Sequence, residues 1–479
     1  MDQPHLFGNE DGRCAADAAR LWLQLVEKES RCKALEYRLA AMESSRSWRV
    51  TAPLRSFVSR FRRAPAQSVA ARPALEPGCA PGAAVAWQPV FHEAARGMGL
   101  ADGFGGHQDS PRCLVDVTEL ALQDMGAGVQ RVTRRWLSEL LVSPPTGRRM
   151  EPVRLSSQGE YVLAREFLAG MLGLGSGDLG EDRPIEARPT DCFLGLDFCR
   201  DHADVLDTAL AGLREQRVPI TLLLPDMLPL QHPEWFPPGI GTSFVAWLEV
   251  CIRRADQVVC ISNDSLQAFK EELEGRPGLQ DLRTVVVPLG ADLPWASSVP
   301  LPTRRPGSVR LLMVGTVEPR KRYPQALDAF EMLEGMGEAV DLVIVGRRGW
   351  ESQGFFRRLA RHPQAGRNLH WLEDADDATL AAAYLDSDLL VMASAGEGYG
   401  LPVIEAANAG CRLLLRDLPV FREVAGDVAR YFSGEQGADL AHAIQDAIKH
   451  PAPPETLHSR PWPSWQHSAF ILKNETIQG

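Results

Sequence analysis

The sequence predicts an α/β protein made of two Rossmann-like lobes that face a central cleft. From residue 113 onward, short apolar runs alternate with helix-length amphipathic segments. The alternation stops at a proline-rich stretch, residues 293–308, and then starts again. Strands this apolar are buried on both faces, which favours parallel sheets covered by helices. A chain of 479 residues is also too long for one ordinary core.

Changes in composition divide the chain into six predicted segments. They are a helical coiled-coil and basic amphipathic extension (1–63), a linker rich in Pro, Ala and Gly (64–110), a first lobe (111–292), a hinge (293–308), a second lobe (309–450) and a tail (451–479). Ligands of open α/β sheets bind beyond the carboxyl ends of the strands, so we expect the site between the two lobes.

The extension begins with a predicted helix over residues 15–43. Its apolar positions recur with heptad spacing, interrupted by Lys28, which predicts a short coiled coil that self-associates or binds a partner. Three heptads with a lysine at one seam position are marginal alone, so a solvated amphipathic helix is the alternative.

A basic stretch follows the predicted coiled coil. Residues 46–63 hold six arginines, and no acid occurs between Glu43 and Glu76. Apolar residues fall on one helical face of this stretch: Leu54, Phe57, Val58 and Phe61. The pattern is typical of a helix lying on an anionic membrane surface, and a solvated basic linker is the alternative.

The whole-chain composition excludes several classes of protein. The formal net charge of -11 argues against a nucleic-acid partner. The nine cysteines form no C-x-x-C pair, so we expect reduced thiols and neither a zinc nor a redox site. The GSGDLG stretch at 175–180 is followed at once by EDRP, where Pro184 blocks a helix, so no nicotinamide cofactor is expected. No signal peptide or membrane span is apparent, which predicts a cytoplasmic protein, peripheral at most at the inner face of the membrane.

The first segment that indicates chemistry reads DLLVMASAGEGYGLPVIEAANAG, a buried strand, a glycine-rich loop and a helix that we expect to start at Pro402. Gly396, Gly398 and Gly400 allow the backbone to approach a ligand closely. The helix N-terminus offers free N–H groups and the positive end of its dipole. The segment therefore predicts a phosphate site.

Two glutamates flank this predicted phosphate site. Glu397 lies in the loop, and we expect Glu405 in the first turn of the helix, where it can accept hydrogen bonds from sugar hydroxyls of a nucleotide. An alternative is that both are ordinary carboxylates favoured by the helix dipole.

The second segment reads VRLLMVGTVEPRKRYPQALDAF, again strand, turn and helix. Gly315 follows the strand, and the turn clusters Arg320, Lys321 and Arg322. Crowded cations are costly unless an anion lies among them, and a diphosphate can be bound by a forked Arg and a Lys without any metal. A solvated charge run is the alternative.

Residues 309–432 closely resemble the group 1 family of retaining glycosyltransferases with the GT-B fold. GTVEPRKR matches the family's Arg-Lys donor motif, VDLVIVGRRGW its following strand and turn, and EGYGLPVIEAANAG its pair of glutamates. The resemblance implies that Arg320 and Lys321 neutralise a leaving diphosphate, that Glu397 contacts the transferred sugar and acts with them in catalysis, and that Glu405 binds the ribose.

The same resemblance assigns the remaining donor-binding positions. Gly400 and Leu401 would offer backbone N–H groups to the phosphates, and Gly315 and Gly398 would lie beside the donor. Arg322 departs from the pattern, because many members have a glycine after the lysine. The shape of the phosphate turn is therefore an open question for the structure.

The first lobe resembles a subset of the family that acts on bacterial surface polysaccharides, of the O-antigen or rhamnan type. LVDVTELALQDMGAGVQRVTRRWL is similar to its glycine loop and helix, LLLPDMLPLQHPEWFPPG to its central strand and turn, and SRSWRVTAPLR to a segment that follows coiled coils in such proteins. Candidate contacts with the acceptor or the donor sugar are Gly126, Gly128, Arg131, Asp226 and His232, and a purely structural role is the alternative for His232.

The resemblance implies a metal-independent hexosyltransferase without a cofactor. Its first lobe would face the acceptor and its second would bind the donor. It would transfer a mannose- or rhamnose-type hexose from a nucleotide-diphosphate sugar to a lipid-linked oligosaccharide, with retention of configuration. Two alternatives stay open: a GT-B sugar-nucleotide epimerase, which would need acid/base residues that we do not identify, and a non-catalytic scaffold of a polysaccharide assembly complex.

Overall fold

The computed structural model of the chain describes part of its 479 residues. The described ranges are 110–122, 124, 128–156, 158–172, 174, 177–199, 202–276, 282–291, 299–350, 352–373, 375–451, 457 and 461–477. The predicted extension, the linker up to residue 109, Gly126, residue 292 of the predicted first lobe and residues 293–298 of the predicted hinge lie outside them. Residues 108–162 and 184–479 form one compact unit, and residues 163–183 fall outside that unit.

The first sheet has seven strands in the order β3-β2-β1-β4-β5-β6-β7. The strands are β1 (Arg112–Asp116), β2 (Arg149–Leu155), β3 (Tyr161–Leu163), β4 (Cys192–Gly195), β5 (Ile220–Leu224), β6 (Gln257–Cys260) and β7 (Arg283–Val286). The pairs β1–β2, β1–β4, β4–β5, β5–β6 and β6–β7 are parallel, which confirms the predicted parallel sheet. Strand β3 is too short to have shown a pattern in the sequence.

The helices of this region match the predicted alternation. They are α5 (Thr118–Leu122), α6 (Gly128–Val142), α7 (Arg165–Met171), α8 (Ala203–Glu215), α9 (Leu228–Gln231), the 3-10 turn η2 (Pro233–Trp235), α10 (Ile240–Arg254) and α11 (Asn263–Leu273). Helix α11 begins one residue before the predicted Asp264, because the Ser262 hydroxyl caps it by accepting from the Ser265 N–H at 3.0 Å.

The second sheet has six strands, all parallel, in the order β10-β9-β8-β11-β12-β13. The strands are β8 (Val309–Val314), β9 (Val340–Val345), β10 (Leu369–Leu372), β11 (Leu389–Met392), β12 (Arg412–Arg416) and β13 (Arg430–Phe432). The first five are the predicted strands, and β13 is an addition at the edge. The order reverses between β8 and β11, so a ligand site is expected where these two strands end.

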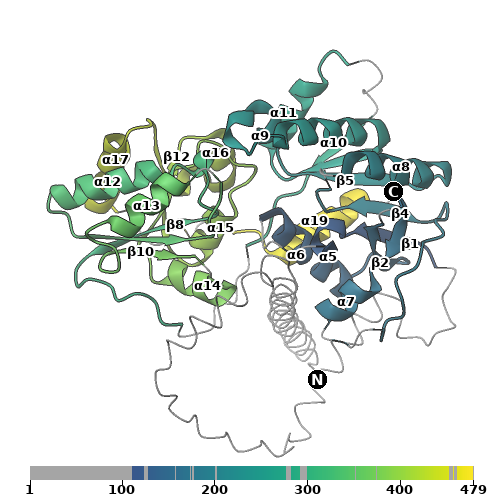
Figure 1. Ribbon diagram of the computed structural model, residues 1–479, viewed down its shortest axis with the longest axis horizontal. Coiled ribbons are helices and arrows are strands. Elements are labelled where there is room, and N and C mark those ends of the chain that lie inside the picture. The colour runs from purple at the N-terminus through teal and green to yellow at the C-terminus, as the bar shows by residue number, and fades with distance from the viewer. Residues whose placement is uncertain are drawn as a thin grey trace, which may run out of the picture. The chain divides into compact units, whose positions relative to one another are not determined.

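Helices cover both faces of this sheet. They are the 3-10 turn η3 (Pro319–Lys321), α12 (Tyr323–Gly335), α13 (Gln353–Arg361), α14 (Asp377–Leu385), α15 (Leu401–Asn408), α16 (Pro419–Ala425), the 3-10 turn η4 (Gly426–Val428) and α17 (Gly437–Lys449). Helices α12 and α17 lie side by side (Figure 1) and bury Leu327, Phe330 and Ile444 against the strands. This apolar core holds the carboxyl ends of the strands in place.

The segment predicted as a tail contains helix α19 (Trp465–Thr476), which packs along α6 (Figure 1). The Trp136 indole donates to the Ser468 hydroxyl at 2.8 Å, and that hydroxyl donates to the Pro288 carbonyl at 2.6 Å. Trp465 is buried directly over Gly290, where a Cβ atom would lie 2.2 Å from the Trp465 nitrogen. The end of the described chain is therefore part of the first core.

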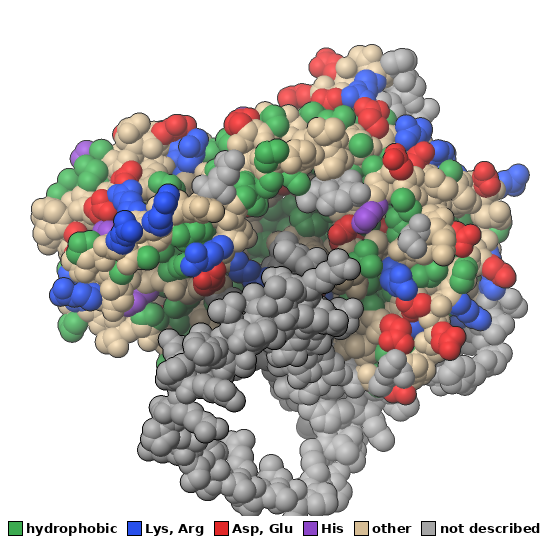
Figure 2. All heavy atoms as spheres, viewed as in Figure 1, with side chains coloured by type: hydrophobic (Ala, Val, Ile, Leu, Met, Phe, Trp, Pro, Cys, Tyr) green, Lys and Arg blue, Asp and Glu red, His purple; other side chains and the backbone are tan. Residues whose placement is uncertain are grey.

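The described surface bears on the predicted partners. The face in Figure 2 carries Lys and Arg side chains intermixed with Asp and Glu. The absence of a nucleic-acid partner stays a prediction. Among the described helices, none has the length and apolar character to cross a membrane.

The six described cysteines, including Cys113 and Cys192 on neighbouring strands, are free and buried.

Candidate active site

The turn after strand β8 carries the predicted cations. Gly315 has a φ of +131°, and a Cβ atom there would lie 3.4 Å from the Lys321 Cε. The Gly315 carbonyl accepts a 2.6 Å hydrogen bond from the Tyr323 hydroxyl at the start of α12. Glycine thus leaves room for the Lys321 side chain to pass over the strand end.

Arg322, the departure from the family pattern, adopts the conformation that glycine prefers. Its φ of 54° and ψ of 35° are left-handed, and it precedes the first residue of α12. The phosphate turn therefore keeps a left-handed residue although the side chain is an arginine. A non-glycine residue pays roughly 1–2 kcal/mol for this conformation.

Because Arg322 is strained in this conformation, we expect Arg322→Gly to raise the free energy of unfolding. Its one described ion pair, to Glu435 at 3.8 Å, joins largely exposed groups and contributes little. We expect the free energy of unfolding to rise by about 1 kcal/mol, measured by denaturant melts. Arg217→Gly, at the other described non-glycine residue with positive φ (59°), should give a similar gain. An unchanged or lower stability for both variants would contradict this account.

A buried charge cluster forms where the β8 turn meets the glycine loop. The Lys321 ammonium donates to the Glu397 Oε1. The Arg320 Nη1 donates to the Glu397 Oε2 at 2.8 Å and to the Gly396 carbonyl at 2.9 Å. Burial alone would raise the pKa of Glu397, but Lys321 and Arg320 more than offset it and lower this pKa to about 2. Glu397 is thus ionised, with both of its oxygens held by cations.

Two further carboxylates belong to this cluster. Glu318, only 5% exposed, lies with its Oε1 2.5 Å from the Arg320 Nε. Burial raises the pKa of Glu318, and Arg320 opposes the rise. Burial likewise raises the pKa of Asp226, which follows β5, and Arg320 again opposes it. Asp226 was a predicted candidate, whereas Glu318 was missed although it lies two residues before Arg320.

The glycine loop is packed closely by residues that follow β5 and β6. A Cβ atom at Gly396 would lie 2.7 Å from the Trp235 ring, and one at Gly398 would lie 2.8 Å from the Pro225 carbonyl oxygen. The Ser262 hydroxyl donates to the Gly398 carbonyl at 2.7 Å. In the described structure, the atoms that lie close to Gly396 and Gly398 therefore belong to other residues of the protein.

Helix α15 follows the loop. Gly400 has a φ of +97° and precedes Leu401, the first helical residue, so the helix starts one residue before the predicted Pro402. Glu405 lies in the second turn, not the first as predicted, because it is the fifth of eight helical residues. It is 1% exposed, and its Oε2 accepts from the Tyr384 hydroxyl at 2.8 Å.

Arg131, predicted from a separate part of the sequence, pairs with Glu405. The Arg131 Nη1 lies 2.8 Å from the Glu405 Oε1. Arg131 comes from α6 beside the first sheet and Glu405 from α15 beside the second, so the structure brings together two candidates 274 residues apart in number. Tyr384 was missed, since nothing in its local sequence distinguishes it from a core tyrosine.

Comparison with known proteins identifies the family. Residues 302–460 match the family model of glycosyl transferases group 1. A serotype-specific mannosyltransferase, WbdA of Escherichia coli, is 36% identical over 385 residues, which cover 76% of this chain and 45% of the relative. The chain belongs to the group 1 family of glycosyltransferases. It spans less than half the length of this relative.

Two further similarities concern a more distant sequence and the fold. A phosphatidyl-myo-inositol mannosyltransferase of Mycobacterium leprae is 30% identical over 198 residues, 37% of this chain and 51% of that one. The crystal structure of WaaG, described as a glycosyltransferase involved in lipopolysaccharide biosynthesis, superposes with a TM-score of 0.53 at 13% identity, covering 77% of this chain and all of that one. The fold of this group 1 protein is GT-B.

Not every predicted site residue joins the charge cluster. His232 stacks on Trp235 with ring centroids 3.8 Å apart, and its Nδ1 lies 3.2 Å from the Glu234 carboxylate. It therefore supports the tryptophan that packs on Gly396. Gly128 begins α6 in open space, with no heavy atom within 4 Å of a Cβ placed there.

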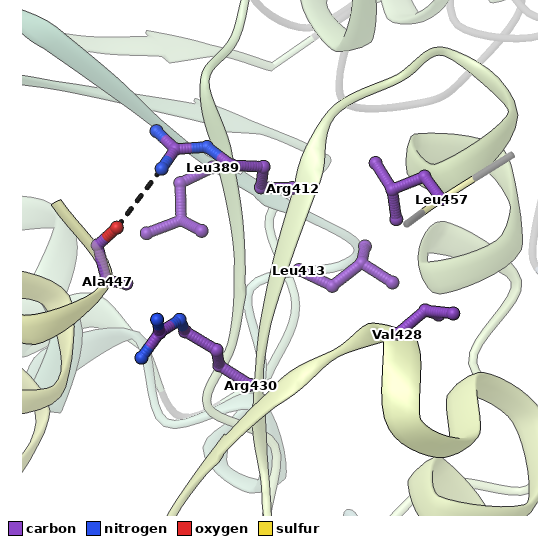
Figure 3. A pocket seen from close by; sticks show the side chains of 7 residues that line it. All are labelled: Leu389, Arg412, Leu413, Val428, Arg430, Ala447 and Leu457. Atoms are coloured by element: carbon purple, nitrogen blue, oxygen red, sulfur yellow. Dashed lines mark hydrogen bonds between the residues drawn. The ribbon is translucent and has the colours of Figure 1, made fainter. Parts of the chain in front are cut away.

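A pocket of about 330 Å³, part of it open to solvent, lies at the other edge of the second sheet (Figure 3). Leu389, Arg412 and Arg430, the first residues of β11, β12 and β13, line it, and Arg412 donates to the Ala447 carbonyl at 3.1 Å. The charge cluster lies beyond the carboxyl ends of the strands, so this pocket is separate from the candidate active site.

Proposed function

We propose that this chain transfers a mannose-type hexose from a nucleotide-diphosphate sugar to a lipid-linked surface glycan, with retention of configuration. The observation that carries the proposal is the meeting of Arg320, Lys321 and Glu397 beside the N-terminus of α15. The names of the relatives favour mannose over the rhamnose that we also considered.

The proposed chemistry is mainly electrostatic. When the bond between the sugar C1 and the diphosphate breaks, negative charge grows on the leaving oxygens. Arg320, Lys321 and the backbone N–H groups at Gly400 and Leu401 are placed to stabilise it. Because the two side chains supply the positive charge, we propose that no divalent metal and no cofactor is needed.

Donor binding should rearrange the ion pairs of the cluster. Without donor, the two oxygens of Glu397 pair with Arg320 and Lys321. A diphosphate has the charge and geometry to compete for Arg320 and Lys321, which would release Glu397 toward the sugar. The acceptor hydroxyl would then attack C1 on the face that the phosphate leaves, and its proton would pass to a leaving phosphate oxygen. Asp226, beside the cluster, is the candidate that contacts the sugar.

The N-terminal extension would bring the protein to its acceptor. We propose that residues 46–63 attach the protein to the anionic inner face of the cytoplasmic membrane, where a lipid-linked acceptor resides, and that residues 15–43 form a coiled coil with a second copy or a partner. Both segments lie outside the described residues, and the support for this proposal is the charge and spacing of the sequence.

A donor panel tests the proposed function. We expect the full chain to release nucleoside diphosphate from one member of a set of GDP-, UDP- and dTDP-linked sugars, and the rate to be unaffected by EDTA. Glu397→Gln should slow this release about a hundredfold. Epimerised donor without release of nucleotide would favour the epimerase, and neither binding nor turnover of any donor would favour the scaffold.

A further inference from the structure

The Glu405 carboxylate has one hydrogen-bond partner and one ion-pair partner among the described residues. Its Oε2 accepts from the Tyr384 hydroxyl of α14, and its Oε1 pairs with the Arg131 guanidinium of α6, each at 2.8 Å. Only 1% of Glu405 is exposed. A buried carboxylate in this setting is costly unless it is paired and hydrogen-bonded, so Arg131 is the group that makes an ionised Glu405 tolerable there.

Helix α6 presents more than one arginine to the second lobe. Arg135 follows Arg131 by one helical turn, so both lie on the same face, and its Nη2 lies 3.7 Å from the Asp377 carboxylate at the start of α14. Arg134 lies between them and pairs instead with Asp124, before α6. One face of α6 thus pairs with Glu405 of α15 and with Asp377 of α14. Arg134 serves as a matched residue outside these two contacts.

The charges around Glu405 act in opposite directions. Burial raises the pKa of Glu405. Arg131 and the Tyr384 hydroxyl lower it, Asp377 raises it and Arg135 lowers it, and burial outweighs the opposing groups, so the pKa of Glu405 lies above its usual range. An ionised carboxylate accepts hydrogen bonds at both oxygens, as the two hydroxyls of a ribose require, whereas a protonated one must donate from one of them. Whatever keeps Glu405 ionised and oriented therefore controls its ability to hold a ribose.

We propose that Arg131, contributed by the first lobe, is a positioning residue of the nucleotide site that orients Glu405 and keeps it ionised for the ribose of the donor. The inference rests on the proposed function, in which Glu405 binds the ribose. Its consequence is that nucleotide affinity depends on helix α6 as well as on the second lobe.

The test is the affinity of the full-length protein for GDP and for UDP, measured by calorimetry from pH 5.5 to 8.5. For the nucleotide that the wild type binds more tightly, Glu405→Gln should weaken binding about tenfold at all pH values, since charged hydrogen bonds to the ribose are lost. Arg131→Gln should weaken binding about tenfold at low pH and recover toward the wild type at high pH. Removal of Arg131 raises the pKa of Glu405, so the ionised form is lost as pH falls, starting from a higher pH.

Controls separate the possible results. Arg134→Gln should bind like the wild type at every pH, and Arg131→Gln should add no further loss in a Glu405→Gln background. If Glu405→Gln leaves the affinity unchanged, the ribose assignment fails. If Glu405→Gln weakens binding while Arg131→Gln matches the wild type throughout, the role of Arg131 is overturned. A loss in Arg131→Gln that does not vary with pH overturns its role in keeping Glu405 ionised. Thermal melts of each variant identify any that fail to fold.

Discussion

Lys321→Ala should lower the turnover number by about a hundredfold or more, because it removes a preorganised positive charge opposite the leaving diphosphate. Lys321 is buried, and burial lowers its pKa while the Glu397 carboxylate opposes that change. A cation fixed in so enclosed a site stabilises developing charge more strongly than one in water does. Steady-state release of nucleoside diphosphate from the preferred donor measures the loss.

The control for this result is Lys449→Ala, at an exposed lysine of α17 remote from the turn after β8. We expect it to retain normal turnover. Arg320→Ala should resemble Lys321→Ala, since Arg320 holds the other oxygen of Glu397. Near-normal turnover in both Lys321→Ala and Arg320→Ala, or a strict requirement for a divalent metal, would count against the proposed phosphate site.

Gly346→Ala should destabilise the second lobe by about 3 kcal/mol, the upper range for overpacking a close contact. Gly346 follows β9, and a Cβ atom there would lie 1.9 Å from the Gly315 carbonyl oxygen and 2.6 Å from the Gly315 carbonyl carbon. Both are backbone atoms of the neighbouring strand end, so no side-chain rotation relieves the clash. Denaturant melts measure the change.

The same substitution should also weaken nucleotide binding, because Gly315 begins the turn that carries Arg320 and Lys321. Gly335→Ala is the matched control. Gly335 ends α12, no heavy atom lies within 4 Å of a Cβ placed there, and helical alanine is favoured over glycine by about 0.5–1 kcal/mol. It should leave stability unchanged or slightly raised. If Gly346→Ala were as stable as the wild type, the ends of β8 and β9 would have to lie farther apart than in this structure.

The long apolar strands were predictable, and the short edge strands were not. Runs such as VRLLMV and VDLVIV are buried on both faces and show this in their composition. Strands β3 and β13 have only three residues each. The three residues of β3 are apolar and buried but too few to form a pattern, and Arg430 and Tyr431 of β13 are half-buried, so that segment carries little apolar signal. They become strands because a neighbouring strand supplies hydrogen-bond partners, which is a property of the assembled sheet.

The cluster of Arg320, Lys321 and Glu397 was predictable as a set, because each residue lies in a loop at the carboxyl end of a buried strand, and such ends share one edge of a parallel sheet. Its detailed pairing was not predictable. That both oxygens of Glu397 face cations, and that Glu318 flanks Arg320, depends on side-chain directions which only the folded turn sets.

The α/β lobes, the turn with its three cations and the glycine loop could be predicted from the sequence alone, since local apolar patterns and turn residues act over short stretches of chain. The pairing of Arg131 with Glu405 and the return of α19 to α6 follow from the folded protein. These contacts join residues hundreds of positions apart. Their partners are selected by the burial of charge and apolar surface in the assembled protein, which leaves no periodic trace in the local sequence.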